Sequence, residues 1–309
     1  MNSALAALAG LVLAIVLIIR KVPPVFSLLL GAVAGGLLAG WGVETTVAQM
    51  ISGVKDIVPA IVRIIAAGVL SGMLIVTGAA DSIAVAIVGK LGAKRIYLAL
   101  ALAAMLLTAT GVFIDVAVIT IAPIALVAGS RTGAPLPKLL LAMIGGGKCG
   151  NIISPNPNTI IASENFGAPL QGVMFANLVP AIIGLAVTVW LIIPLIPETK
   201  NAGAAAPAAA TMPSGRQLPS FLASIAGPLL AVALLALRPV FGISIDPLVA
   251  LPAGGIFGLL TTRKWRMTLE SLRCGLEKMA PVAVLLVGTG TIAGIIKASD
   301  ITSIVVNML

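Results

Sequence analysis

Residues 145–159 carry the densest group of side chains that could bind a polar ligand. They read GGGKCGNIISPNPNT, which places one lysine among amides and two hydroxyls in a chain that is otherwise strongly apolar. Glycine and proline at this density are expected to interrupt a helix, and non-helical backbone at membrane depth must line a cavity or be buried in protein. We predict that this segment binds a small anion through Lys148, Asn151, Ser154, Asn156, Asn158 and Thr159.

Two physical features make an anion the expected ligand of this segment. Lys148 can pair with a carboxylate, and a helix that starts near Thr159 would add the positive potential of its N-terminus. The alternative is an extramembrane loop between two spans. The flanking apolar stretches are short for separate spans, and the polar side chains are mostly amides and hydroxyls rather than charges, which favours the binding segment.

Asp115 is the second candidate. It lies between Thr110-Gly111 and the apolar run 116–122. A fixed charge inside a membrane helix costs about 2.5–3.5 kcal/mol, so it needs a partner, a proton or a wet cavity. We predict that Asp115 and Thr110 form the site of a coupling ion, either a proton or Na⁺. The alternative is an aspartate that only caps the helix that follows.

Composition determines the solvent in which these residues must work. Of 309 residues, 60% are hydrophobic and 9% charged, against about 45–50% and about 25% in soluble domains. Apolar runs near the roughly 20 residues that span a bilayer recur along the chain. We predict an all-α polytopic membrane protein, a secondary transporter with broken or re-entrant helices.

Several other functions are made improbable by what the sequence contains. It has no histidine, and its two cysteines form no CxxC pair, so we expect no metal site, no cofactor and no enzyme activity. The net charge of +9 comes from residues at the ends of apolar runs, with few aromatics between them. This pattern indicates membrane anchoring with positive loops inside, rather than nucleic-acid binding.

The apolar runs are expected to break at particular places. Interruptions are predicted at residues 78–81 and 110–115, and Pro59 and Pro281 are each expected to begin a new helix. Residues 172–196 read as an ordinary span. Charge places the loops at 20–21, 90–95, 200–216 and 263–278 in the cytoplasm and the N-terminus outside.

The chain repeats itself. Pro24, Leu28, Gly31, Gly35 and Leu37 recur 223 positions later as Pro247, Leu251, Gly254, Gly258 and Leu260, and Pro59 recurs as Pro281. Because the charge assignment gives the first helix and its counterpart opposite directions, we predict inverted repeats, a signature of secondary transporters. The expected division is a first repeat at 1–197, an Ala/Pro-rich cytoplasmic linker at 198–218 and an incomplete second repeat at 219–309.

The sequence resembles the gluconate permease family of gluconate:proton symporters. Residues 110–117, TGVFIDVA, followed by Pro123, resemble its glycine-phenylalanine-acidic element, and Ser154-Pro155-Asn156-Pro157-Asn158 occupies the place of its proline-rich element. The family's element usually contains histidine, whereas this chain has asparagines there. The resemblance covers the whole of this chain, which corresponds to only about the first two-thirds of a typical family member.

The resemblance implies import of gluconate or a related small organic or sugar acid anion, by proton or sodium symport, across the bacterial inner membrane. A homo-oligomer is left open. Two alternatives stand beside this interpretation. One is a citrate- or dicarboxylate-type carrier of the same superfamily. The other is a truncated, non-transporting membrane scaffold, which the incomplete second repeat would favour.

Overall fold

The computed structural model describes residues 2–197 and 217–301, and these form helices joined by short turns, without a β-strand. The predicted linker therefore lies almost entirely outside the described residues. Within the described residues, three helical segments are long and apolar enough to cross a bilayer: 43–76, 170–195 and 265–298. Six shorter apolar helices accompany them. The prediction of an all-α membrane protein is confirmed.

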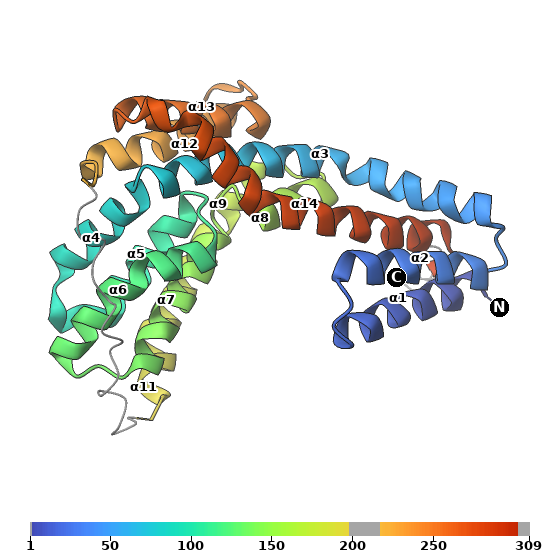
Figure 1. The fold of residues 1–309 in the computed structure, drawn as a ribbon, viewed down its shortest axis with the longest axis horizontal. Coiled ribbons are helices and arrows are strands. Elements are labelled where there is room, and N and C mark those ends of the chain that lie inside the picture. The colour runs from blue at the N-terminus through green and yellow to red at the C-terminus, as the bar shows by residue number, and fades with distance from the viewer. Residues whose placement is uncertain (1, 198–216, 302–309) are drawn as a thin grey trace. The chain divides into compact units, whose positions relative to one another are not determined.

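The chain divides into two compact units, and each is described by itself. The first unit comprises residues 1–62 and 279–309. It contains α1 (Ser3–Ile19), α2 (Pro24–Leu38), the N-terminal part of α3 (Val43–Val76) and the C-terminal part of α14 (Thr268–Ala298). In Figure 1, α1 and α2 lie side by side in blue. The core between these elements is made of Ala7, Ala32, Met50, Ile292 and Ile295.

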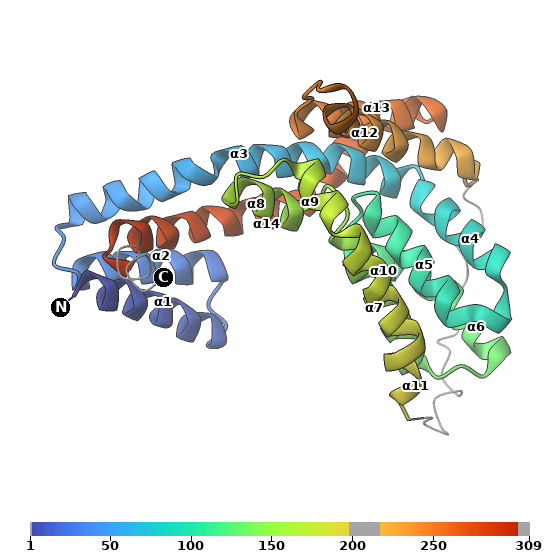
Figure 2. The same cartoon turned by 180° about the vertical axis from the view of Figure 1, so that it is seen from behind.

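The second unit comprises residues 63–278. After the end of α3 come α4 (Ala79–Leu91), η1 (Ala93–Arg95), α5 (Ile96–Ala109), α6 (Ile114–Thr132), α7 (Leu136–Asn151) and α8 (Pro157–Asn165). They are followed by α9 (Leu170–Ala176), α10 (Leu178–Ala186), η2 (Val187–Ile192), α11 (Ile193–Leu195), α12 (Phe221–Phe241), α13 (Pro247–Thr261), η3 (Trp265–Met267) and the start of α14. In Figure 2, α10 runs alongside α7.

Two of the predicted interruptions are confirmed. Helix α3 ends at Val76 and α4 begins at Ala79, with Gly78 at φ 74° between them. Helix α5 ends at Ala109 and α6 begins at Ile114, with Gly111 at φ 96°. Glycine has no Cβ and adopts these left-handed angles without steric cost, which is why the chain can turn sharply here.

Two predictions about helix boundaries are wrong. Pro59 and Pro281 lie inside α3 and α14 instead of beginning new helices. Each proline removes one backbone donor, but in apolar surroundings the remaining helical hydrogen bonds are retained because no water replaces them. The predicted span at 172–196 is confirmed as the apolar helical segment 170–195, within which α9 ends and α10 begins at Asn177 and the π-helical η2 follows.

The packing of α3 against α14 occurs twice, once in each unit. In the first unit, a Cβ on Gly53 would overlap the backbone at Gly290 and Gly294. In the second unit, a Cβ on Gly275 would overlap the backbone at Gly68. Gly275, Gly290 and Gly294 stand 222 positions after Gly53, Gly68 and Gly72. The same close contact is therefore built twice, with the roles of the two helices exchanged.

Candidate functional site

The two polar elements singled out in the sequence meet in the second unit. Helices α5 and α7 pack so closely that a Cβ on Gly146 would overlap the carbonyl of Ala101, and one on Gly150 that of Met105. The hydroxyl of Thr108 donates across the interface to the carbonyl oxygen of Gly147 at 2.8 Å. The break after α5 and the break after α7 are thus held by one helix pair, which lies side by side in Figures 1 and 2.

The glycine-rich part of the predicted binding segment is not irregular. Residues 145–151 continue α7, contrary to the expectation that they could not propagate a helix. Glycine has low helix propensity, but here it permits close helix contact, and a continuous helix pairs backbone donors that apolar surroundings would leave unsatisfied. Only residues 152–156 are non-helical, and α8 begins at Pro157 rather than near Thr159.

Asn156 organises this break. Its side-chain oxygen accepts from the backbone N–H of Asn158 at 2.7 Å and of Thr159 at 3.4 Å, which makes it the N-cap of α8. Its amide nitrogen lies 2.6 Å from both the side-chain oxygen of Asn151 and the hydroxyl of Ser154. The Thr159 hydroxyl accepts from the Asn156 N–H at 3.2 Å, which completes a capping box.

Exposure separates the six predicted substrate residues into two groups. Ser154, Asn156 and Thr159 are buried and bonded to one another, so they fix the shape of the break. Lys148 and Asn158 are exposed, and Asn151 is half-buried. Since the backbone donors of Asn158 and Thr159 are already used by the cap, an anion would meet the exposed side chains first.

The predicted ion-coupling residues lie next to this region. Thr110 is buried at the end of α5, where its hydroxyl donates to the Leu107 carbonyl at 2.7 Å. Asp115 stands in the first turn of α6, and its carboxylate is 3.8 Å from the Lys278 ammonium group. The side chain of Ile114 covers Gly147. Asp115 and Lys148 therefore each lie next in sequence to one of the two residues, Ile114 and Gly147, that contact each other.

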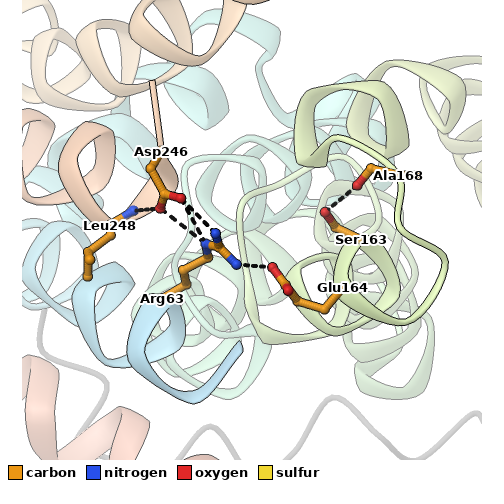
Figure 3. Close-up of polar contacts among 6 residues, drawn as sticks. All are labelled: Arg63, Ser163, Glu164, Ala168, Asp246 and Leu248. Atoms are coloured by element: carbon orange, nitrogen blue, oxygen red, sulfur yellow. Dashed lines mark hydrogen bonds and ion pairs between the residues drawn. The ribbon is translucent and has the colours of Figure 1, made fainter. Parts of the chain in front are cut away.

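A second polar group, formed by Arg63, Glu164 and Asp246, was not predicted from the sequence. Figure 3 shows the Arg63 guanidinium between two carboxylates. Its Nη2 is 2.7 Å from Asp246 and its Nε 3.1 Å from the same carboxylate, while Nη1 contacts Glu164. Asp246 also caps α13 by accepting from the Leu248 N–H at 2.8 Å. Arg63 therefore joins α3 to the end of α8 and the start of α13.

A cavity of about 290 Å³ lies beside this cluster, just below the range of roughly 300–1,000 Å³ for ligand pockets. Its lining includes Ser163, Gln171 and Ser244. The charged side chains among its lining residues are Arg63, Glu164 and Asp246, which leaves a formal excess of one negative charge. This balance disfavours an organic anion, so we interpret the cluster as the anchor that positions α8.

The Arg63 pair makes the stability of the protein depend on pH in a defined direction. The hydrogen bonds from Arg63 hold the pKa of Asp246 below its ordinary value, against the opposing effect of burial. A lowered folded-state pKa stabilises the fold above the unfolded value of about 4 and ceases to do so as pH falls through the folded value.

We therefore expect Asp246→Asn to lower the thermal unfolding temperature at pH 7, with a difference from wild type that shrinks below about pH 4. Asparagine retains the N-cap, so the substitution isolates the charge pairing. Thermal unfolding in detergent across pH 3–8 measures it, with Asp56→Asn, which removes an exposed pair with Lys297, as the control. A difference that is constant across this range would contradict the expectation.

Comparison with known proteins decides the family. The sequence model of the GntP family permeases matches residues 3–250, which is most of the chain. The chain belongs to the GntP family of permeases. The resemblance seen at residues 110–123 and 154–158 is thereby confirmed, and the protein is a membrane transporter. A Na⁺-H⁺ antiporter family model also matches this permease, over residues 223–309. No solved structure matches the chain.

Its relatives are bacterial proteins. The permease is 49% identical to a Haemophilus influenzae protein named as an uncharacterized transporter, over 99% of this chain and 73% of the relative. It is 30% identical to a gluconate permease of Pseudomonas aeruginosa, over 75% of this chain and 53% of the relative. It is also 30% identical to an inner membrane permease of Escherichia coli, over 59% of this chain and 39% of the relative. The chain thus spans about half or less of the last two relatives.

Proposed function

We propose that this permease imports gluconate or a related small organic acid anion by proton or sodium symport across the bacterial inner membrane. The observation that carries the proposal is the junction of two broken helices, which places the exposed Lys148 beside a capped, non-helical segment. The family and the name of the Pseudomonas aeruginosa relative support the substrate class. The match to an antiporter family supports coupling to H⁺ or Na⁺.

In this proposal the residues have separate roles. Lys148 and Asn158 contact the anion, with Asn151 at the edge of the site, while Ser154, Asn156 and Thr159 hold the break in shape. Asp115 carries the coupling ion, because its carboxylate is exposed, and the ion would replace the Lys278 ammonium group that lies 3.8 Å away. Thr110 closes the preceding helix and presents its oxygen to the same region.

The duplication belongs to the same proposal. We infer that residues 1–197 and 219–309 are inverted repeats on either side of the 198–218 linker, giving a multi-pass protein. The exchanged glycine contacts of α3 and α14 support it, as do α2 and α13, which are both 15 residues long and start 223 positions apart. Such repeats are typical of carriers that alternate access around a central site.

Uptake by the purified chain in liposomes tests the function. We expect labelled gluconate to accumulate under an imposed H⁺ or Na⁺ gradient, to be displaced by other sugar acids, and to leak out when the driving gradient is collapsed. Asp115→Asn should abolish accumulation but preserve exchange of labelled for unlabelled substrate, because exchange needs no net movement of the ion. Displacement by citrate instead of sugar acids would indicate the citrate-type carrier. If the protein takes up neither gluconate, other sugar acids nor citrate, the alternative of a non-transporting membrane scaffold would be favoured.

A further inference from the structure

A cavity of about 520 Å³ lies in the second unit, and none of the residues proposed for transport is among those given for its lining. It is formed by η1, the start of α5 and η2. Its lining consists of Lys94, Arg95, Tyr97, Leu98, Val189 and Trp190. One wall is therefore basic and the other apolar and aromatic, a combination that matches an amphipathic ligand with an anionic head.

The charged wall faces outward. Lys94 and Arg95 form η1 with Ala93, immediately before α5, and both side chains are exposed. The N-terminus of α5 adds the partial positive charge of the helix dipole. None of the described residues that line the cavity is acidic. The local field in this part of the described structure therefore favours a phosphate or carboxylate.

The apolar wall has an unusual backbone. Val189 and Trp190 lie in η2, a π-helical segment within the apolar span 170–195. π-Helical turns are rare, and they frequently occur at functional sites. The Trp190 side chain is 66% exposed, so most of its ring is available to a ligand rather than packed in the protein.

The depth of the cavity indicates which ligand it fits. Trp190 is five residues from the end of the span at Leu195, or about 7–8 Å at 1.5 Å per residue, a depth at which tryptophan meets the headgroup region of a bilayer. Lys94 and Arg95 flank the start of an apolar helix. Charge counting places the loops at 90–95 and 200–216 on the cytoplasmic side, where membrane lipids carry negative charge.

We propose that this cavity binds an anionic phospholipid of the cytoplasmic leaflet. Lys94 and Arg95 bind the phosphodiester, and an acyl chain lies along Val189 and Trp190. The proposal rests on the protein being embedded in a membrane and not on the identity of the transported substrate. Its failure would therefore leave the proposed transport function untouched.

Lipid binding to the full chain in an uncharged detergent tests the proposal, with native mass spectrometry as the readout. The probes are dioctanoyl phosphatidylglycerol, dioctanoyl phosphatidylethanolamine and glycerol 3-phosphate. We expect phosphatidylglycerol to bind more tightly than phosphatidylethanolamine and glycerol 3-phosphate not to bind. The double variant Lys94→Gln/Arg95→Gln should weaken phosphatidylglycerol binding by roughly tenfold to thirtyfold, at about 1 kcal/mol per basic residue.

The double variant Arg20→Gln/Lys21→Gln is the matched control. It removes one arginine and one lysine from a loop assigned to the same side, but these residues do not line the cavity. It should keep the wild-type lipid preference. If the Lys94/Arg95 variant does not fold, Trp190→Ala provides the second test. It should weaken the binding of phosphatidylglycerol and of phosphatidylethanolamine by a similar factor.

Three results would overturn the proposal. The first is equal binding of the two lipids by the wild type. The second is equal loss of phosphatidylglycerol binding in the two double variants. The third is binding of glycerol 3-phosphate as tight as that of phosphatidylglycerol, which would indicate a site for soluble phosphates instead of lipid.

Discussion

Replacing Lys148 with alanine should reduce the efficiency of substrate uptake, kcat/KM, by about 10- to 100-fold. In the proposed function this ammonium group is the cation that meets the substrate carboxylate, and a hydrogen bond to a charged group contributes about 1.5–3 kcal/mol. Lys148 is exposed and lies in the last turn of α7, next to the break. Initial rates of gluconate uptake into liposomes, measured over a range of concentrations, test this.

Two control variants are needed to interpret this result. Lys148→Arg preserves the charge and should recover part of the uptake, because arginine can still pair with a carboxylate. Lys55→Ala removes another exposed lysine, on α3 in the first unit, and should leave uptake unchanged. Wild-type kinetics in the Lys148→Ala variant would remove Lys148 from the proposed site.

Asn156→Ala should lower the stability of the protein by roughly 2–4 kcal/mol and strongly reduce uptake. The substitution removes the N-cap of α8, which contributes about 0.5–2 kcal/mol, and leaves buried polar groups of the break without partners at about 1–3 kcal/mol. Asn156 is only 4% exposed, so water cannot replace these bonds. Thermal unfolding in detergent and uptake in liposomes measure the two effects.

Asn158 supplies the control two residues away. Its side chain is exposed, whereas its backbone N–H is the group that Asn156 caps. Asn158→Ala should therefore keep the wild-type unfolding temperature while lowering uptake. Asn156→Asp, which keeps the capping oxygen but loses the amide donors, should fall between wild type and Asn156→Ala. An Asn156→Ala protein that unfolds at the wild-type temperature would show that the cap does not hold the break.

Local sequence pattern predicted the helix breaks that depend on local backbone freedom. Gly78 and Gly111 lie in turns with positive φ, and both interruptions are where the pattern placed them. The same reasoning was wrong at Gly145–Gly150, because a glycine has two uses that composition cannot separate. It can end a helix, or it can let two helices approach closely, and α5 packed against α7 makes the second use here.

The sequence by itself determined that the protein lies in a lipid bilayer, that it is helical and to which family it belongs. It also indicated the residues around the α7–α8 break, since all of these follow from composition and from contiguous motifs. Tertiary structure alone decided which groups of that break are buried and which are exposed. It also decided that Arg63 meets Glu164, 101 positions later, and Asp246, 183 positions later. Such pairs depend on how helices that are far apart in the sequence are brought together in space, and no local pattern of residues encodes that arrangement.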